Sequence, residues 1–202
     1  MQLSEDDTPY RGTALEHLLI QHLTSFYDVG EHNHIRLRGA DWNDGLDMAE
    51  KRGESVAFTA LYGGNLRDLA KDIMTLSKKT GKDTISLAKE IEVLLNADKT
   101  VYDSIDEKHK VLNAYCNAVG HKVSGEKVSV DCTKLCNVLN EMSSWIADHI
   151  RKTEWITNKE GNSWFNGYYD NSGNAVEGDF SSGVRMMLTG QVLLRMSRWQ
   201  KL

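Results

Sequence analysis

Hydrophobic residues recur at helical spacing through much of the chain. Within residues 13–27, apolar side chains at positions 15, 18, 19, 23 and 26 form one stripe of a helix. Thr13 and Glu16 have the spacing of a capping box at its start. Similar patterns, with cap residues before them and glycines after two of them, predict helices over residues 55–79, 85–96, 104–119 and 131–152, and a last helix from about residue 183.

Short extended segments are predicted between these helices. Alternation over residues 122–130 indicates an extended or hairpin segment, and residues 35–37 a short extended piece. The run Asp170-Asn171-Ser172-Gly173 predicts a turn that joins strands 164–169 and 174–176. The chain has a single proline, which suits a largely helical protein. The pattern therefore predicts an all-α fold with small β-hairpin excursions.

Composition restricts the class of protein. Hydrophobic residues make up 40% of the chain and charged residues 26%, which is typical of a folded domain. The net charge of −5 argues against nucleic acid as the main partner. The sequence has no apolar run of membrane-spanning length and no signal-peptide pattern. Three cysteines do not suit a secreted disulfide framework, so we predict a cytoplasmic protein. Cys132 and Cys136 lack partners at zinc spacing and are interpreted as buried thiols.

The most informative segment lies in a long predicted loop, residues 28–52. It holds three carboxylates within seven positions, together with Trp42 and Asn43, and glycines at 39 and 45 disfavour a helix. An acid, an aromatic face and an amide are the groups that hold a sugar and protonate its glycosidic oxygen. A solvated acidic loop is the alternative interpretation. A calcium loop starting at Asp41 is excluded, because it requires a ligand at 45, glycine at 46 and glutamate at 52.

Two segments of the chain together match a known pattern. They are Ala40-Asp41-Trp42-Asn43-Asp44-Gly45-Leu46 with Gly53-Glu54-Ser55-Val56, and Trp164-Phe165-Asn166-Gly167-Tyr168-Tyr169-Asp170-Asn171-Ser172-Gly173 with Val184-Arg185-Met186-Met187-Leu188-Thr189-Gly190-Gln191-Val192. In these segments the chain resembles the inverting β-glucoside phosphorylases, the cellobiose phosphorylase-like enzymes of glycoside hydrolase family 94. The resemblance extends over about residues 9–192, and residues 193–202 diverge.

The resemblance implies a fold and a reaction. The fold would be part of an (α/α)6 toroid of paired helices (a six-hairpin glycosidase-like fold), with residues 1–202 as a single partial catalytic domain. The reaction would convert a β-linked glucose disaccharide or oligosaccharide and inorganic phosphate into a sugar 1-phosphate and a shortened acceptor. Asp44 matches the general acid, and phosphate replaces the base-activated water of a hydrolase, so a second catalytic carboxylate is not required.

Further site residues are expected around this acid. Trp42 would stack on a sugar ring, and Asn43, Asp41 and Arg38 would orient sugar hydroxyls or carboxylates. Gln191, near the start of the last helix, would reach a sugar hydroxyl. The two histidines at positions 32 and 34 alternate as on one face of a strand. They are interpreted as a polar approach to the loop, because a metal site would need a third ligand.

Two other functions remain open at this point. An inverting hydrolase on the same toroid would need a second carboxylate, for which Glu177 and Asp179 are the candidates. A non-enzymatic remnant would at most bind sugar. We expect no cofactor or metal, no nucleic-acid or membrane partner, and phosphate as co-substrate. Because the resemblance places most phosphate-binding residues after residue 202, we expect the isolated chain to be inactive and to self-associate or require a complementing chain.

Overall fold

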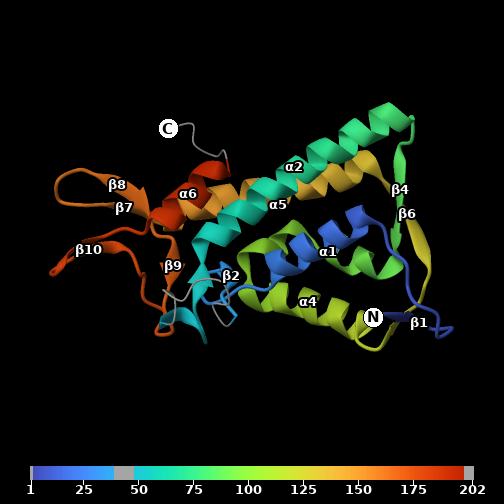
Figure 1. Ribbon diagram of the computed structural model, residues 1–202, viewed down its shortest axis with the longest axis horizontal. Helices are drawn as coiled ribbons and strands as arrows, with labels where there is room; N and C mark the ends of the chain where they lie inside the picture. The colour runs from blue at the N-terminus through green and yellow to red at the C-terminus, as the bar shows by residue number, and fades with distance from the viewer. Residues whose placement is uncertain (1, 39–47, 198–202) are drawn as a thin grey trace. The chain divides into compact units, whose positions relative to one another are not determined.

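The computed structural model describes residues 2–38 and 48–197, which form two compact units. Unit 1 comprises Met1–Asp28 and Leu66–Met142, and unit 2 comprises Val29–Asn65 and Ser143–Leu202. Two of the three boundaries fall inside long helices, α2 (Val56–Thr80) and α5 (Cys132–Thr153), which Figure 1 labels. The third falls between residues 28 and 29. The prediction of one partial domain stays a prediction.

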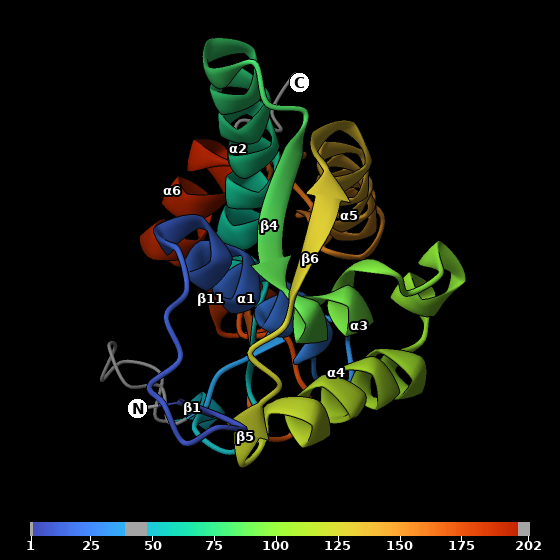
Figure 2. The same ribbon diagram turned by 90° about the vertical axis from the view of Figure 1, so that its right-hand side faces the viewer.

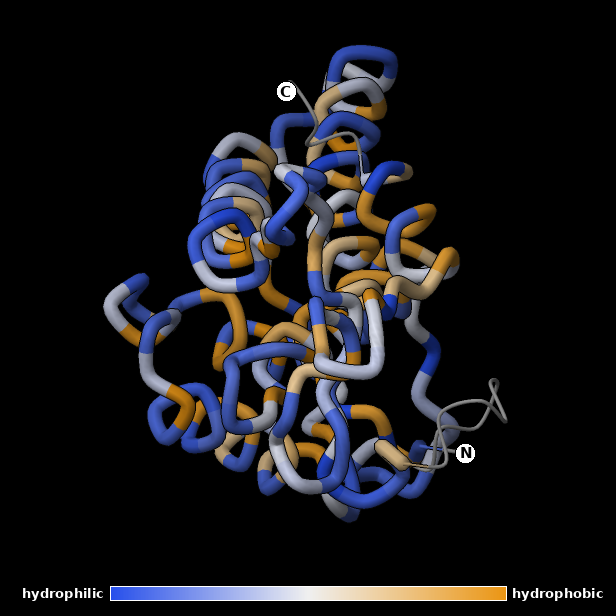
Figure 3. The backbone as a smooth tube through the Cα atoms, turned by 90° about the vertical axis from the view of Figure 1, so that its left-hand side faces the viewer, coloured by the Kyte–Doolittle hydropathy of each residue, from blue (hydrophilic) through white to orange (hydrophobic). Residues whose placement is uncertain are grey.

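Four predicted helices are confirmed. They are α1 (Ala14–Tyr27), α2, α4 (Ile105–Val119) and α5. The Thr13 Oγ1 accepts a hydrogen bond from the backbone N–H of Glu16 at 3.1 Å, and Ser104 caps α4 in the same way. Gly81, with φ of +67°, follows the end of α2, where a left-handed residue suits glycine. Helical turns of the tube in Figure 3 carry both hydrophobic and hydrophilic residues, as expected for helices with one apolar stripe.

Unit 1 combines helices with a two-stranded antiparallel ribbon. α1 packs against α4 and against the short α3 (Glu92–Leu95). The ribbon consists of β4 (Thr84–Ala88) and β6 (Lys127–Asp131), which run side by side (Figure 2). β1 (Leu3–Ser4) pairs in parallel with β5 (Lys122–Val123), and two 3-10 turns, η2 (Lys89–Ile91) and η3 (Lys99–Asp103), complete the unit. Cys132 and Cys136 are buried free thiols, as predicted.

The predicted helix over residues 85–96 is wrong. Its first part is strand β4, whose five residues all pair with β6, and only Glu92–Leu95 is α-helical. Ile85, Ala88 and Ile91 recur at the spacing of a helical stripe. Ile85 and Leu87 alternate as in a strand, so the apolar pattern fits both. The backbone of residues 84–88 finds its hydrogen-bond partners in β6, which lies more than thirty positions away in the sequence. Long-range pairing of this kind decides between the two patterns.

Unit 2 is built from short strands around a small core. β2 (Ile35–Arg36), β3 (Glu54–Ser55) and β9 (Tyr168–Tyr169) form one antiparallel sheet in the order β2-β3-β9. Two further pairs are β7 (Trp155–Thr157) with β8 (Ser163–Phe165) and β10 (Gly178–Phe180) with β11 (Gly183–Arg185). Helix α6 (Leu188–Met196) follows. The core cluster comprises Leu37, Ala49, Ala57, Tyr168 and Val176, with Phe58, Met187 and Leu193 packed against it.

The fold class predicted from the sequence is also wrong. Over the described residues, helices account for 53% and strands for 19%, in a mixed α/β arrangement and not an all-α partial toroid. The last helix begins at Leu188 and not near Gly183, because Gly183–Arg185 pairs as a strand with Gly178–Phe180. The turn at Asp170 is confirmed: its carboxylate accepts hydrogen bonds from the N–H groups of Ser172 and Asn174. Within the described part of the chain, no helix is long and apolar enough to cross a membrane.

The strand assignment of β4 leads to a stability prediction. Leu87 is fully buried, so Leu87→Ala should lower the free energy of unfolding by about 2–5 kcal/mol. The matched control is Leu76→Ala in α2, where the side chain is 50% exposed and the expected change is within about 0.5 kcal/mol. Urea unfolding of both variants measures the difference. Equal effects of the two substitutions would contradict the burial of β4.

Candidate functional site

Main-chain hydrogen bonds fix the chain on both sides of residues 41–47, which we call the acid-rich segment. The N–H of Leu37 donates to the carbonyl of Gly53 at 2.8 Å, before the segment. After it, the carbonyl of Met48 accepts from the N–H of Asn171 at 2.7 Å. The side-chain oxygen of Asn171 also accepts from the N–H groups of Lys51 and Arg52, at 2.7 and 2.8 Å. The turn of the second matching segment therefore fixes residues 48–52, which lie between the two matched parts of the first.

A buried carboxylate, that of Glu54, organises the chain before the acid-rich segment. Glu54 is 1% exposed, and its two oxygens accept hydrogen bonds from the N–H groups of His32 and His34 and from Nδ1 of His32, at 2.8–3.1 Å. Asn33 lies between the histidines with φ of +64°, a conformation that asparagine tolerates better than most residues. The position of Gly30 admits no side chain, because a Cβ there would lie 2.4 Å from the Glu54 carboxyl carbon.

The two histidines therefore do not occupy one face of a strand. Their backbone N–H groups converge on Glu54 from a turn, and their rings have different surroundings. The ring of His32 is 31% exposed and stacks on Tyr169 with ring centroids 3.6 Å apart. His34 is fully buried, and its Nε2 lies 2.9 Å from a carboxylate oxygen of Glu154. Both residues thus act in a polar network next to the loop.

Glu154 is the second buried carboxylate of the network. It follows the C-terminal end of α5 and accepts hydrogen bonds from His34, from the amide of Asn166 at 3.1 Å and from the hydroxyl of Tyr169 at 3.0 Å. Burial alone would raise the pKa of Glu154. The hydrogen bond and charge of His34, with the Asn166 amide, outweigh burial and lower this pKa to about 2. Glu154 is therefore a fixed negative charge. Burial of the Tyr169 hydroxyl, together with this charge, raises the pKa of Tyr169.

Glu177 is the third buried carboxylate, and its environment is different. It accepts hydrogen bonds from the N–H groups of Gly167 and Met187, at 2.9 and 3.0 Å, and from the Gln191 side chain at 3.2 Å. Burial dominates over these three bonds and raises the pKa of Glu177 to about 7. A Cβ at Gly167 would lie 2.6 Å from a Glu177 oxygen, so this close approach requires glycine.

The predicted site residues fall into two groups. Asp41, Trp42, Asn43 and Asp44 lie outside the described residues. Arg38 is described and exposed. The side chain of Gln191 makes two hydrogen bonds with the backbone of Phe165: its Nε2 donates to the carbonyl at 2.7 Å, and its Oε1 accepts from the N–H at 3.4 Å. Its Nε2 also donates to Glu177. Its contacts attach α6 to β8, and the predicted contact with a sugar stays a prediction.

Sequence reasoning did not identify Glu54, Glu154 and Asn166 as parts of a site. For two of them a signal was available: Glu54 follows a glycine within the first matching segment, and Asn166 precedes a glycine within the second. The strand pairing of β3 with β9 brings these two segments together. Among the residues that the structure describes, no group of three or more His, Cys, Asp or Glu side chains is arranged to hold a metal ion.

Comparison with known proteins adds no relative. No protein-family model matches the chain, and a search of curated proteins gives no significant match.

The environment of Glu177 predicts a pH-dependent stability. Its pKa is raised from 4.5 to about 7, so its contribution to stability is fully present below pH 4.5 and is lost as the pH rises through 7. The contribution is about 3 kcal/mol by linkage. Glu177→Gln removes this titration, and the difference in unfolding free energy between wild type and variant should therefore change between pH 4.5 and 8.

The matched control for this measurement is Glu160→Gln, an exposed glutamate of unit 2. Because the difference between wild type and variant is measured at each pH, titration of other groups cancels. A difference for Glu177→Gln that stays constant from pH 4.5 to 8 would contradict the raised pKa.

Proposed function

We propose that this chain carries the acid-bearing part of an inverting β-glucoside phosphorylase. The substrate class is a β-linked glucose disaccharide or oligosaccharide, with inorganic phosphate as co-substrate. The products are a sugar 1-phosphate and the shortened acceptor. The proposal concerns the chemistry and not the toroid, which the mixed α/β fold replaces.

One observation carries the proposal. The two segments that resemble the phosphorylases lie 115 positions apart at Glu54 and Tyr169, and in unit 2 their strands pair residue by residue. Strand β3 of the first pairs with β9 of the second, Glu54 with Tyr169 and Ser55 with Tyr168. Asn171 adds three hydrogen bonds to residues 48–52. A pair of segments that serve one active site must lie together in this way.

In the proposed mechanism Asp44 is the general acid. It donates its proton to the glycosidic oxygen while that oxygen leaves the anomeric carbon. A phosphate oxygen attacks the same carbon from the opposite face, so the new bond has inverted configuration. Trp42 stacks on the sugar, and Asn43, Asp41 and Arg38 bind its hydroxyls. In this proposal, residues of a second copy or of a complementing chain complete the phosphate site.

The hydrolase alternative has less support. It requires a carboxylate that activates water, and Glu177 and Asp179 are the candidates in the second segment. Both oxygens of Glu177 are engaged by N–H donors, and the residue is 1% exposed. It is therefore held as an internal contact of unit 2 and is not presented to water. The location that we propose is the cytoplasm, where buried thiols such as Cys132 and Cys136 stay reduced.

The assignment of the acid is tested by Asp44→Asn. Asparagine cannot donate the proton, so phosphorolysis should fall by about 10²- to 10⁴-fold while sugar binding persists. Glu50→Gln is the matched control, because Glu50 is an exposed acid that follows the segment directly. Sugar 1-phosphate release from cellobiose and laminaribiose is measured with phosphate, for the chain alone and with a complementing chain.

Three results would contradict the proposal in different ways. Activity of Asp44→Asn above about a tenth of the wild-type kcat removes Asp44 as the acid. Release of free glucose that does not depend on phosphate supports the hydrolase. Sugar binding without turnover in either preparation supports a non-enzymatic sugar-binding protein.

A further inference from the structure

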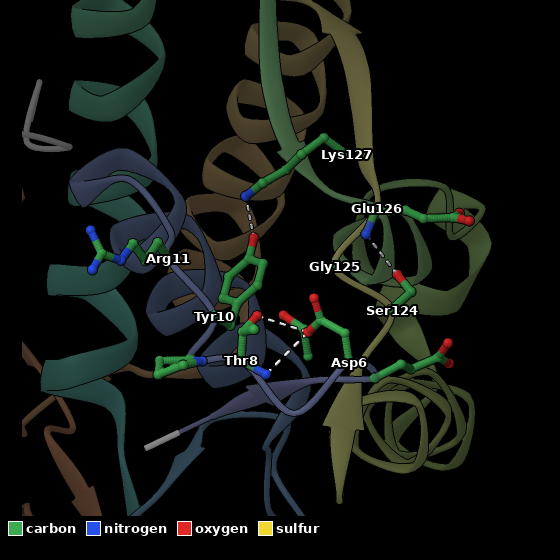
Figure 4. A pocket seen from close by; sticks show the side chains of 11 residues that line it. Asp6, Thr8, Tyr10, Arg11, Ser124, Gly125, Glu126 and Lys127 are labelled. Carbon is green, nitrogen blue, oxygen red and sulfur yellow. Dashed lines mark hydrogen bonds between the residues drawn. The ribbon is translucent and has the colours of Figure 1, made fainter.

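Unit 1 contains a pocket that the proposed reaction does not use. It has a volume of about 800 Å³ and lies between the N-terminal segment, residues 4–11, and residues 124–127 (Figure 4). The parallel pairing of β1 with β5 brings these two segments together. Gly125 adopts φ of +78°, and a Cβ there would meet Ser4 at 3.4 Å. The volume is within the range of small-molecule sites, about 300–1,000 Å³. We call it the N-terminal pocket.

The side chains in one wall of the N-terminal pocket are held by a buried carboxylate. Glu16 is 1% exposed, and it accepts hydrogen bonds from the Tyr10 hydroxyl at 2.6 Å, from Nζ of Lys127 at 3.0 Å and from the N–H of Ala88 at 2.8 Å. Lys127 also donates to the Tyr10 hydroxyl, and its ammonium lies 4.4 Å from the Tyr10 ring centre. Both side chains are therefore fixed before any ligand binds, which lowers the entropic cost of binding.

Other polar groups of the pocket are also fixed or available. The carboxylate of Asp6 accepts from the N–H and the hydroxyl of Thr8, at 3.1 and 2.7 Å (Figure 4). The hydroxyl of Ser124 donates to the carboxylate of Glu90 and accepts from the N–H of Glu126. Arg11 and Glu5 are exposed and line the pocket, and among the described residues neither side chain has a hydrogen-bond or ionic partner.

The charged side chains that line the N-terminal pocket indicate the class of ligand. Three acidic side chains line the pocket beside two basic ones, so an oligoanion meets repulsion as well as attraction. A metal ion is disfavoured, because no three ligating side chains cluster in the described part of the chain. A neutral ligand with many hydroxyls uses both kinds of group: it donates to carboxylates and accepts from Arg11 and Lys127. Pro9 and the ring of Tyr10 add apolar surface for a sugar face.

We propose that the N-terminal pocket is a saccharide-binding site of unit 1, separate from the acid-rich segment of unit 2. Its ligand is a β-linked glucose oligosaccharide, and this choice of sugar rests on the proposed function. The pocket binds the oligosaccharide without cleaving it, through Arg11, Glu5 and the preset Tyr10–Lys127 pair.

The test is an NMR titration of the 202-residue chain with cellotriose and laminaritriose. Saturable shifts are expected at the amides of Ser124, Gly125 and Glu126. The double variant Glu5→Gln/Arg11→Ala removes two exposed groups and should weaken binding by about ten-fold or more, since hydrogen bonds to charged groups are lost. The double variant Lys79→Ala/Glu141→Gln is the control. It removes the same charges from exposed positions of unit 1 outside the pocket and should bind as wild type does.

Shifts at these amides that are absent, or equal in wild type and Glu5→Gln/Arg11→Ala, would overturn the proposal. Shifts produced by inorganic phosphate and not by the trisaccharides would overturn the ligand class. Asp44→Asn should leave the pocket shifts unchanged, which separates the two sites. Pocket binding without phosphorolysis, both for the chain alone and with a complementing chain, would refute only the proposed reaction. Phosphorolysis without pocket shifts would refute only this inference.

Discussion

The geometry of unit 2 depends on the carboxylate of Glu54. A buried carboxylate is costly unless it is paired, and here its partners are the N–H groups of His32 and His34 and the His32 ring. These bonds fix the turn at Asn33 and with it the strand that leads into the acid-rich segment. The same residue begins strand β3, which pairs with both β2 and β9. One residue thus connects three parts of unit 2: its side chain holds the turn before the segment, and its backbone pairs with β2 and β9.

The other two buried carboxylates differ in protonation and so in role. Charge and hydrogen bonds from His34 lower the pKa of Glu154 to about 2, whereas burial raises the pKa of Glu177 to about 7. Carboxylates whose environments separate their pKa values in this way are characteristic of active sites. In the proposed phosphorylase, Glu154 is a permanent charge that fixes Tyr169 and Asn166. Glu177 attaches α6 to residues 165–167 with a strength that depends on pH.

Local signals in the sequence were sufficient for some elements and not for others. The helices α1, α2, α4 and α5 were predictable, because each has its own apolar stripe and a cap or a terminating glycine. Strand β4 was not, because its apolar spacing fits a helix equally well and its partner β6 is remote. The all-α prediction failed mainly over residues 154–185, where short strands pair across turns. The acid-rich segment was recognisable from residue types, whereas Glu54 and Glu154 belong to a site only through pairings that the sequence does not display.

Amide hydrogen exchange tests the central role of Glu54 most directly. In wild type, the amides of His32 and His34 should exchange slowly, because each donates to the buried carboxylate. Glu54→Gln replaces one acceptor oxygen with an NH2 group that cannot accept, so one oxygen remains for the three donors of His32 and His34. Protection at these two amides should fall, and with it protection at Leu37 and Gly53. Unchanged exchange at His32 and His34 in Glu54→Gln, or fast exchange of both already in wild type, would contradict the account.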